Sequence, residues 1–356
     1  MKQRLLLLVL AHLGLGNECY NFNCTSTNPD SICSLFSPNE KTYFTSPCQS
    51  NTTECKVAPL GKVANSTCED APAETPVLYP GDKCENYNCT YGTCQKGVCV
   101  GKDKGETCSQ TEQCGVGLYC SQKVCTPLLK EGDKRCTSDY DCLNNLGCDK
   151  LPTATSGTCK RYFSIKDHAE VQNCNQFKNS LCQSQVCNSK NNKYYCGSLV
   201  SSNSVPAQCE KVSDCLSTTD EFFGVGYYSE CKCGYNANAT KYCDLFPGDE
   251  DYKEWTDTLK LWYNSSEISK CHTLRRLSSN CMYDWWNLTD ASGLLYYQSR
   301  VNYWPKLQNT EDCVGKVYLK DYYQALADYN KYRPDPDDDE SSTYLLLAPI
   351  FCLTFF

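Results

Sequence analysis

The chain contains very little histidine and methionine. Among its 356 residues are three histidines and two methionines. The sequence also lacks the HExxH motif of zinc hydrolases, the GxSxG motif of serine hydrolases and the glycine-rich loop that cradles phosphates. We therefore expect a protein that is not an enzyme and that uses no cofactor and no catalytic metal.

Two histidines lie outside the apolar N-terminal segment. His168 lies in SIKDHAEV, and His272 lies in KCHTL. We interpret both as surface or packed residues, because neither belongs to a recognisable catalytic motif. A catalytic role would require a pocket that gathers either ring with carboxylates.

The chain also lacks an excess of basic residues. Its formal net charge is −8, which argues against nucleic acid or anionic lipid as a partner, since both attract a basic surface. The basic N-terminus and the apolar residues 5–15 are followed by an expected cleavage after Gly16. This layout is typical of a secretory signal peptide over residues 1–16, and it is too short for a membrane span.

Cysteine, in contrast, is abundant. The chain has 31 cysteines, a density that is typical of disulfide scaffolds in oxidising compartments. Closely spaced cysteines could instead ligate zinc as thiolates, but disulfides are favoured at this density in a secreted chain. The patterns concerned are the even run Cys84, Cys89, Cys94 and Cys99 and the close pair Cys231 and Cys233.

The cysteine spacing repeats along the first two thirds of the chain. Twenty-seven cysteines lie between Cys19 and Cys243. The words GDKC, GETC and GDKRC each open a unit with a glycine and an acidic residue, which is turn chemistry. Five residues separate the first three cysteines of the units that begin at Cys108 and Cys136, and a looser copy begins at Cys209. A polar residue precedes the second cysteine in TEQC and in DYDC.

Units of about 25 residues are too small to bury a sufficient core, so we expect cross-links to stabilise them. Each bridge contributes about 2–4 kcal/mol, mainly by restricting the unfolded chain. Short loops close at little entropic cost, so most bridges should lie within a unit, although the pairing cannot be deduced. The cysteines that we expect in bridges include Cys84, Cys89, Cys94, Cys99, Cys108, Cys114, Cys120, Cys125, Cys136, Cys142, Cys148, Cys159, Cys209, Cys215, Cys231, Cys233, Cys243, Cys271, Cys281 and Cys313.

The order GD-x-C, five residues, DC, five residues, and GC or GLYC resembles the tandem Dickkopf N-terminal-type cysteine-rich repeats of ciliate surface proteins. The resemblance covers roughly residues 80–245. It implies scaffold modules that share no catalytic residues. The animal Dickkopf proteins modulate receptors, but this chain shows no recognisable second, colipase-like domain, so the resemblance does not carry that role over.

The composition changes near residue 245. In FPGDEDYKEWTDTLKLWYN, Trp255, Leu259 and Trp262 recur at helical spacing behind acidic residues, which predicts a helix. We interpret LRRLSSNCMYDWW and DYYQALADYNKY as further amphipathic helices. The fold class that follows is small and disulfide-rich, with tandem modules of turns and short β-hairpins before a mainly α-helical, aromatic-rich C-terminal domain.

This C-terminal segment is rich in tyrosine and tryptophan. Such side chains stack on sugars or bind protein partners when they are exposed, and they form a core when they are buried. A core is the simpler interpretation for a segment with few aliphatic residues, and both interpretations stay open. The residues concerned are Tyr283, Trp285, Trp286, Tyr296, Tyr297, Tyr303 and Trp304.

Seven Asn-x-Ser/Thr sequons are spread along the chain. In a secreted protein, such sequons indicate N-linked glycans on surface loops. Two of them have cysteine as the middle residue, so we expect lower occupancy there. The asparagines are Asn23, Asn51, Asn65, Asn88, Asn238, Asn264 and Asn287, of which Asn23 and Asn88 precede cysteine.

A mostly apolar tail, residues 344–356, follows an acidic spacer, residues 333–343. The tail is shorter than the ~20 residues that cross a bilayer as a helix, and it resembles a GPI-attachment signal, which is removed. Removal of Cys352 with the tail would leave an even number of cysteines. A buried strand or helix is the alternative, and the attachment residue stays open. The acidic run that ends at Glu340 lacks the glycine turn of a calcium loop, so we interpret it as solvated spacer.

These features together predict a glycosylated protein on the extracellular face of the plasma membrane, held by a GPI anchor, with a structural, coat or adhesion role. Its partner would be an extracellular or cell-surface protein or glycan. An extracellular ligand-binding regulator of Dickkopf type is the alternative. The expected segments are a signal peptide (1–16), an N-terminal cysteine-rich module (17–80), tandem repeats (81–245), a helical domain (246–332), the spacer (333–343) and the apolar signal (344–356).

Overall fold

The structure, a computed structural model, covers the repeats and the helical segment almost completely. The predicted signal peptide, the apolar tail with Cys352, the sequons at Asn51 and Asn65, and all of the spacer except Arg333 lie outside the described residues. The described residues are 19–24, 32–48, 53–56, 67–70, 76–85, 87–172, 174, 180–199, 208–220, 223–310 and 312–333.

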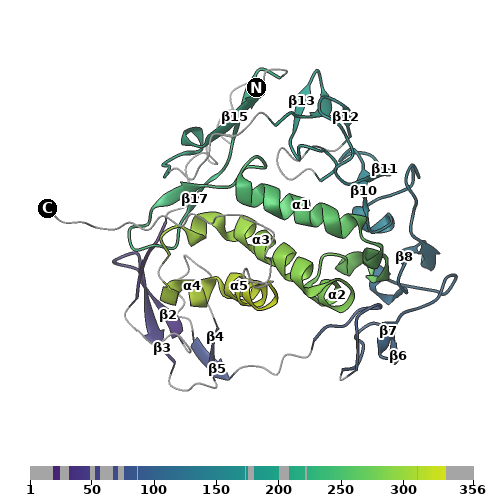
Figure 1. Ribbon diagram of the computed structural model, residues 1–356, viewed down its shortest axis with the longest axis horizontal. Coiled ribbons are helices and arrows are strands. Elements are labelled where there is room, and N and C mark those ends of the chain that lie inside the picture. Colours follow the sequence, from purple (N-terminus) through teal and green to yellow (C-terminus); the bar gives the residue numbers. More distant parts are fainter. Residues whose placement is uncertain are drawn as a thin grey trace, which may run out of the picture.

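Helices occupy the centre of the molecule, and small β-sheets surround them in the view of Figure 1. Short 3-10 helices connect the first two α-helices. We call this group, residues 250–332, the helical hub. Its elements are α1 (Glu250–Asn264), η5 (Ser266–Lys270), η6 (Thr273–Arg275), α2 (Ser279–Trp285), α3 (Leu288–Leu307), α4 (Asp312–Tyr318) and α5 (Lys320–Tyr332).

The strands are short and form small separate sheets. Two sheets have three strands, in the orders β1-β3-β2 and β12-β14-β13, and the others described are two-stranded hairpins. The strands are β1 (Asn21–Asn23), β2 (Ile32–Ser37), β3 (Thr42–Pro47), β4 (Thr53–Lys56), β5 (Thr67–Asp70), β6 (Thr93–Gln95), β7 (Val98–Val100), β8 (Leu118–Ser121), β9 (Val124–Pro127), β10 (Leu146–Asp149), β11 (Thr158–Arg161), β12 (Glu170–Val171), β13 (Cys187–Lys190), β14 (Lys193–Cys196), β15 (Leu216–Asp220), β16 (Val225–Tyr228), β17 (Cys231–Cys233) and β18 (Lys241–Cys243).

These elements confirm the predicted fold class. Fourteen disulfides are present among the described residues, short hairpins make up the modules, and the aromatic-rich segment after residue 249 is helical. The disulfide density fits an extracellular protein, because a reducing compartment would not preserve it.

Six four-cysteine modules share one pairing rule. In each module the first cysteine bonds the third and the second bonds the fourth, so the two loops that the disulfides close overlap in sequence. Each bridge spans only 10 to 28 residues. The pairs are 33–55 with 48–68, 84–94 with 89–99, 108–120 with 114–125, 136–148 with 142–159, 174–187 with 182–196, and 209–231 with 215–243.

A hairpin presents the third and fourth cysteines of every module. The two residues lie directly opposite each other in the antiparallel register, yet each bonds backward to an earlier cysteine. A pair of bridges thus fixes the hairpin to the segment that precedes it. The opposed residues are Cys55 and Cys68, Cys94 and Cys99, Cys120 and Cys125, Cys148 and Cys159, Cys187 and Cys196, and Cys231 and Cys243.

The glycine that opens a unit adopts a backbone conformation that most residues avoid. Gly81, Gly105 and Gly132 have φ values of +98°, +91° and +86°. Each N–H donates to the carbonyl of the last cysteine of its own module, at 2.8, 2.9 and 2.9 Å. His168 has φ +63° and its N–H donates to the Cys196 carbonyl at 2.8 Å. His168 therefore occupies the glycine position of a further module, 174–196, which the sequence interpretation did not recognise.

The polar residue before the second cysteine accepts a hydrogen bond from the backbone that follows the first cysteine. The Asp141 carboxylate accepts a hydrogen bond from the backbone N–H of Thr137 at 2.6 Å, directly after the first cysteine. Asp214 accepts in the same way from Glu210, at 3.0 Å. Each carboxylate also accepts from the N–H of the N-cap residue of a short 3-10 turn, which is Ser138 or Lys211. In the 108–125 module the Gln113 side chain accepts from the Ser109 N–H at 3.0 Å. The turns are η2 (Thr111–Gln113), η3 (Asp139–Asp141) and η4 (Val212–Asp214).

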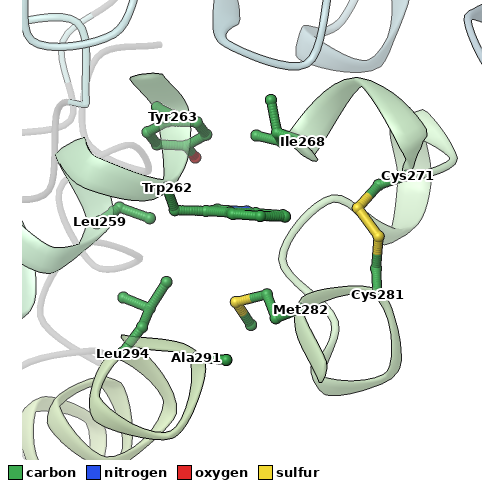
Figure 2. Packing of buried hydrophobic residues seen from close by; sticks show 9 residues of the cluster. All are labelled: Leu259, Trp262, Tyr263, Ile268, Cys271, Cys281, Met282, Ala291 and Leu294. Atoms are coloured by element: carbon green, nitrogen blue, oxygen red, sulfur yellow. A yellow bond between two sulfur atoms is a disulfide. The ribbon is translucent and has the colours of Figure 1, made fainter. Parts of the chain in front are cut away.

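The core of the hub forms around one tryptophan. Trp262 on α1 is fully buried, and its indole N–H donates to the Arg276 carbonyl at 2.6 Å. Leu259, Met282 and Leu294 surround the ring, with the Cys271–Cys281 bridge at one side (Figure 2). The helical spacing of Leu259 and Trp262 thus predicts the buried face of α1 correctly.

Each cysteine module beyond the first contacts the hub through a specific polar pair. A module of this size has little core of its own, so contacts with the hub stabilise it in addition to its disulfide bridges. The donor and acceptor pairs are Trp285 Nε1 to Gly81 O at 2.9 Å, His272 Nε2 with Thr111 O at 3.1 Å, Asn144 Nδ2 to Ile268 O at 2.7 Å, Gln185 Nε2 to Thr256 Oγ1 at 2.6 Å, and Asn309 Nδ2 to Tyr242 OH at 2.7 Å.

The N-terminal sheet also packs on the hub. Phe22 and Tyr43 stack with ring centroids 5.3 Å apart and bury Val314 and Leu319 of the hub. The Cys19–Cys233 bridge joins this end of the chain to β17 across 214 residues. Segments far apart in sequence are thus held together at the side of the hub where β17 and the N-terminal strands lie (Figure 1).

Candidate functional site

A polar cleft of about 390 Å³ lies between α2, α3 and α5. All of its lining residues belong to the hub, and the described residues of the cysteine modules do not line it. Its volume falls within the range of small-ligand sites, about 300–1,000 Å³. The lining residues are Leu277, Ser279, Tyr283, Leu295, Gln298, Ser299, Asn302, Tyr303, Asp321, Gln324, Ala325 and Asp328.

Two carboxylates of α5 define the charge of the cleft. Asp321 and Asp328 lie seven residues apart, which places them on one face of the helix about 10 Å apart along its axis. Gln324 lies between them and donates to Asp328 Oδ1 at 3.1 Å. The lining residues include no lysine or arginine, so the cleft is acidic.

Each carboxylate accepts a hydrogen bond from a tyrosine. The Tyr283 hydroxyl donates to Asp328 Oδ2 at 3.0 Å, and the Tyr303 hydroxyl donates to Asp321 Oδ2 at 3.3 Å. Burial raises the pKa of both phenols, and the adjacent carboxylates raise the pKa of each phenol further. Both tyrosines therefore remain protonated donors at neutral pH.

The side chains of the cleft can bind a polar ligand. Its amides, hydroxyls and carboxylates offer both donors and acceptors, and its tyrosines add apolar ring surface. Such a lining fits a polyhydroxylated ligand or a polar segment of a protein partner. Gln298, Asn302, Asp321, Gln324 and Asp328 were not singled out by the sequence interpretation.

The structure divides the predicted aromatic set between the cleft and the core. Tyr283 and Tyr303 line the cleft. Trp286 packs against Trp262, with ring centroids 5.0 Å apart. The other members also make contacts inside the hub or with a module: Trp285 with the Gly81 carbonyl, Tyr296 with Tyr297 and Tyr329, and Trp304 with Arg300.

His272 is a packed residue at the joint between the hub and the 108–125 module. Its side chain is buried, Nε2 lies 3.1 Å from the Thr111 carbonyl oxygen, and Nδ1 accepts from the Leu274 N–H at 3.3 Å. Burial lowers the pKa of the imidazole. His168, by contrast, belongs to the turn before β12, where its ring lies 6.3 Å from that of Phe223.

The cysteines considered for zinc are oxidised in the structure. The even run forms the Cys84–Cys94 and Cys89–Cys99 bridges. Cys231 and Cys233 bond to Cys209 and Cys19 and not to each other. Their sulfurs are therefore not available as the thiolates that a zinc site requires.

The described sequon asparagines are all exposed. Asn287 also caps α3, because its Oδ1 accepts from the Asp290 N–H at 2.8 Å. Asn264 is the last residue of α1. Exposure makes each position sterically open to a glycan, and the residues are Asn23, Asn88, Asn238, Asn264 and Asn287.

Comparison with known families, curated proteins and solved structures finds no match for this chain. Among the described residues, no helix is both long enough and apolar enough to cross a membrane.

Proposed function

We propose that this is an extracellular recognition protein with an adhesion or coat role, glycosylated and held at the plasma membrane by a GPI anchor. The observation that carries this proposal is the α2–α3–α5 cleft on a disulfide-locked body. The described parts of the modules contact the hub elsewhere and do not line this cleft. The proposed partner is an extracellular glycan or protein that presents hydrogen-bonding groups to the cleft.

The disulfide modules support a scaffold role in this proposal. Their overlapping bridges restrict the unfolded chain and resist reduction outside the cell. Rigid support keeps the cleft residues in place, which lowers the entropic cost of binding. The resemblance to Dickkopf-type repeats agrees with scaffold modules, because such repeats share no catalytic residues.

Binding by the purified ectodomain tests the recognition role. The ectodomain would be applied to arrays of extracellular glycans and to a panel of surface proteins, and the strongest ligand would be titrated against variants. Asp321→Asn removes a cleft charge at an exposed position and keeps the side-chain shape. Asn302→Ala removes an amide. We expect each variant to weaken binding at least about tenfold, which corresponds to about 1.4 kcal/mol.

Asp257→Asn is the matched control. Asp257 is an exposed carboxylate of α1 that pairs with Lys260 and lies outside the cleft. This variant should bind as the unmodified protein does. Equal affinities for all three variants would contradict a recognition role for the cleft.

A further inference from the structure

Two cavities flank the sequon at the end of α1. Asn264, Ser265 and Ser266 form this sequon. The cavities have volumes of about 430 Å³ and about 230 Å³, and both are lined by Asn145, Tyr263 and Asn264. A glycan attached to Asn264 would therefore begin at the boundary between them.

The larger cavity lies between two cysteine modules and the hub. Leu128 and Leu143 line it from the modules, and Ile268 lines it from the hub. Asn144, which is 5 % exposed, also lines it. The Asn144 amide donates to the carbonyls of Ile268 and Cys271, whereas its Oδ1 has no hydrogen-bond donor in the part of the chain that the structure describes. This oxygen is closed off from solvent, so an occupant of the cavity would contact Leu128, Leu143 and Ile268 and would not contact this atom.

The smaller cavity offers the complementary chemistry. Arg161 and Lys260 supply cationic donors at its border. Tyr162, Phe163 and Tyr263 supply aromatic surface, and the Tyr162 and Tyr263 rings stack with centroids 4.5 Å apart. Ring faces together with donors match a sugar, which has an apolar face and hydroxyl acceptors.

We propose that the two cavities form a cradle for the first N-acetylglucosamine units of an N-linked glycan on Asn264. The inference rests on the proposed glycosylation. The apolar faces of these sugars would pack on the Tyr162, Phe163 and Tyr263 rings, and their hydroxyl oxygens would accept from Arg161 and Lys260. The glycan would then join α1 to the 108–125 and 136–159 modules, in contrast to glycans that extend freely into solvent.

A cradled glycan is protected from enzymatic release. The native protein would be treated with peptide-N-glycosidase F in heavy-oxygen water, and release at each asparagine would be followed by peptide mass spectrometry. We expect release from Asn264 to be at least about tenfold slower than release from Asn238, because the enzyme must wait for local opening. Unfolding and reduction should make the two rates equal.

Matched variants test the proposed glycan cradle through the thermal stability of the protein. Ser266→Ala abolishes the sequon and leaves Asn264 in place, whereas Ser266→Thr keeps the sequon. The melting temperature should fall with Ser266→Ala and stay unchanged with Ser266→Thr. At the control sequon, Ala239 and Thr240 border a cavity that no aromatic ring lines, so Thr240→Ala should lower the melting temperature less than Ser266→Ala does.

Two results would overturn the inference and leave the proposed function intact. One is an occupied Asn264 that is released as fast as Asn238 from the native protein. The other is an unoccupied Asn264 in a protein whose Asn238 is occupied. A protein without a glycan at any sequon would instead contradict the proposed glycosylation itself.

Discussion

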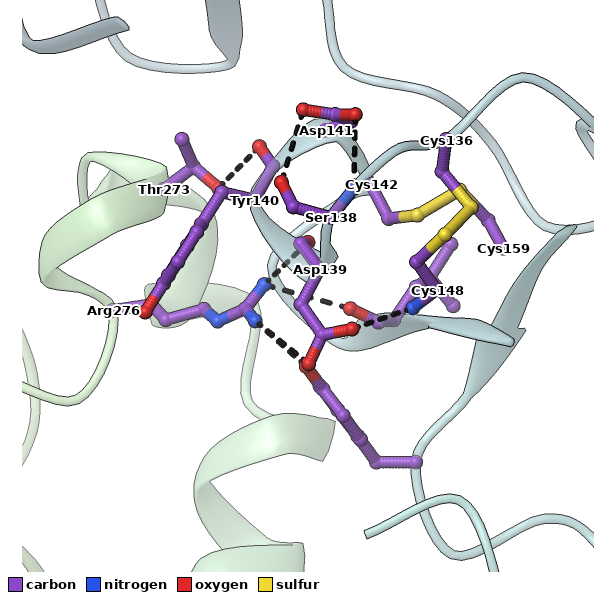
Figure 3. Close-up of polar contacts among 12 residues, drawn as sticks. Cys136, Ser138, Asp139, Tyr140, Asp141, Cys142, Cys148, Cys159, Thr273 and Arg276 are labelled. Carbon is purple, nitrogen blue, oxygen red and sulfur yellow. Dashed lines mark hydrogen bonds and ion pairs between the residues drawn. A yellow bond between two sulfur atoms is a disulfide. The ribbon is translucent and has the colours of Figure 1, made fainter. Parts of the chain in front are cut away.

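Arg276 of the hub donates through Nη2 to the Tyr162 hydroxyl, at 2.6 Å. Its Nη1 donates to the carbonyl of Asp139 at 3.2 Å, and the neighbouring Thr273 donates to the carbonyl of Tyr140 at 2.9 Å (Figure 3). The guanidinium also lies over the Tyr140 and Tyr162 rings, 5.3 and 5.5 Å from their centroids. One buried side chain thus joins the hub to the 136–159 module.

Replacement of this arginine should destabilise the protein strongly. Arg276→Met removes the donor to the Asp139 and Leu146 carbonyls and to the Tyr162 hydroxyl, so we expect the free energy of unfolding to fall by about 2–4 kcal/mol. Lys193→Ala is the control, because Lys193 forms a solvent-exposed pair with Glu170 outside this joint and should cost far less. Urea unfolding with the bridges intact measures both. Equal losses would show that the joint does not depend on Arg276.

The module-opening glycines should differ in their tolerance of a side chain. Gly132 has φ +86° and open space where a Cβ would lie, so Gly132→Ala should cost about 1–2 kcal/mol from the backbone alone. At Gly81 a Cβ would also lie 2.6 Å from the Lys270 carbonyl oxygen. Gly81→Ala should therefore cost clearly more and shift the fluorescence of Trp285, which bonds the Gly81 carbonyl. Equal costs would refute the close contact between this module and the hub.

Acidification should destabilise the contact between the hub and the 108–125 module at His272. Burial holds the pKa of this imidazole below its ordinary value, so the unfolded chain binds the extra proton first. The stabilisation is complete above the unfolded pKa of about 6.5 and is lost as pH falls towards the folded pKa. Glu112 favours the protonated form, and Arg275 opposes it.

The difference between the unmodified protein and His272→Gln isolates this effect. The unmodified protein should lose stability between about pH 7 and pH 5, and the variant should be less stable at about pH 7 but lose less on acidification. Buried Asp82 has a raised pKa and acts with the opposite sign, because its neutral form favours the folded state as pH falls. Identical pH slopes for the two proteins would contradict the role of His272.

The proposed anchor predicts a difference between two kinds of substitution in the tail. A GPI signal is read for its hydrophobicity and then removed. Cys352→Leu should therefore preserve surface display, whereas the double change Leu346→Asp and Leu347→Asp should abolish it, since charges are costly in an apolar environment. Flow cytometry of labelled intact cells measures display. Loss of display with Cys352→Leu would indicate a structural bridge.

The sequence revealed the modules whose opening turns contain glycine and an acid, and it revealed the module that begins at Cys209 through its five-residue cysteine gap. The 174–196 module was missed because His168 and Ala169 replace that pair, and only the hydrogen bond to the Cys196 carbonyl shows the equivalence. The pairing rule was also beyond reach, because spacing alone does not specify which cysteines meet.

The helices and the cleft could also be predicted only in part from the sequence. Trp262 marks the buried face of α1, but the buried face of α3 includes small and polar residues such as Ser292, Gly293 and Ser299, which give no apolar periodicity. Asp321 and Asp328 share a face of α5 at a readable spacing. That Tyr303 and Tyr283 meet them depends on the packing of α2 and α3 against α5, which is a tertiary property.

The most direct test of the proposed role is treatment of intact cells with a phosphatidylinositol-specific phospholipase, followed by intact-mass and peptide analysis of the released protein. We predict release of a glycosylated protein that takes up no alkylating reagent without reduction, and that lacks the peptide containing Phe351, Cys352 and Leu353. A protein that stays on the cells, or a mature surface protein that retains this peptide, would contradict the proposed anchor.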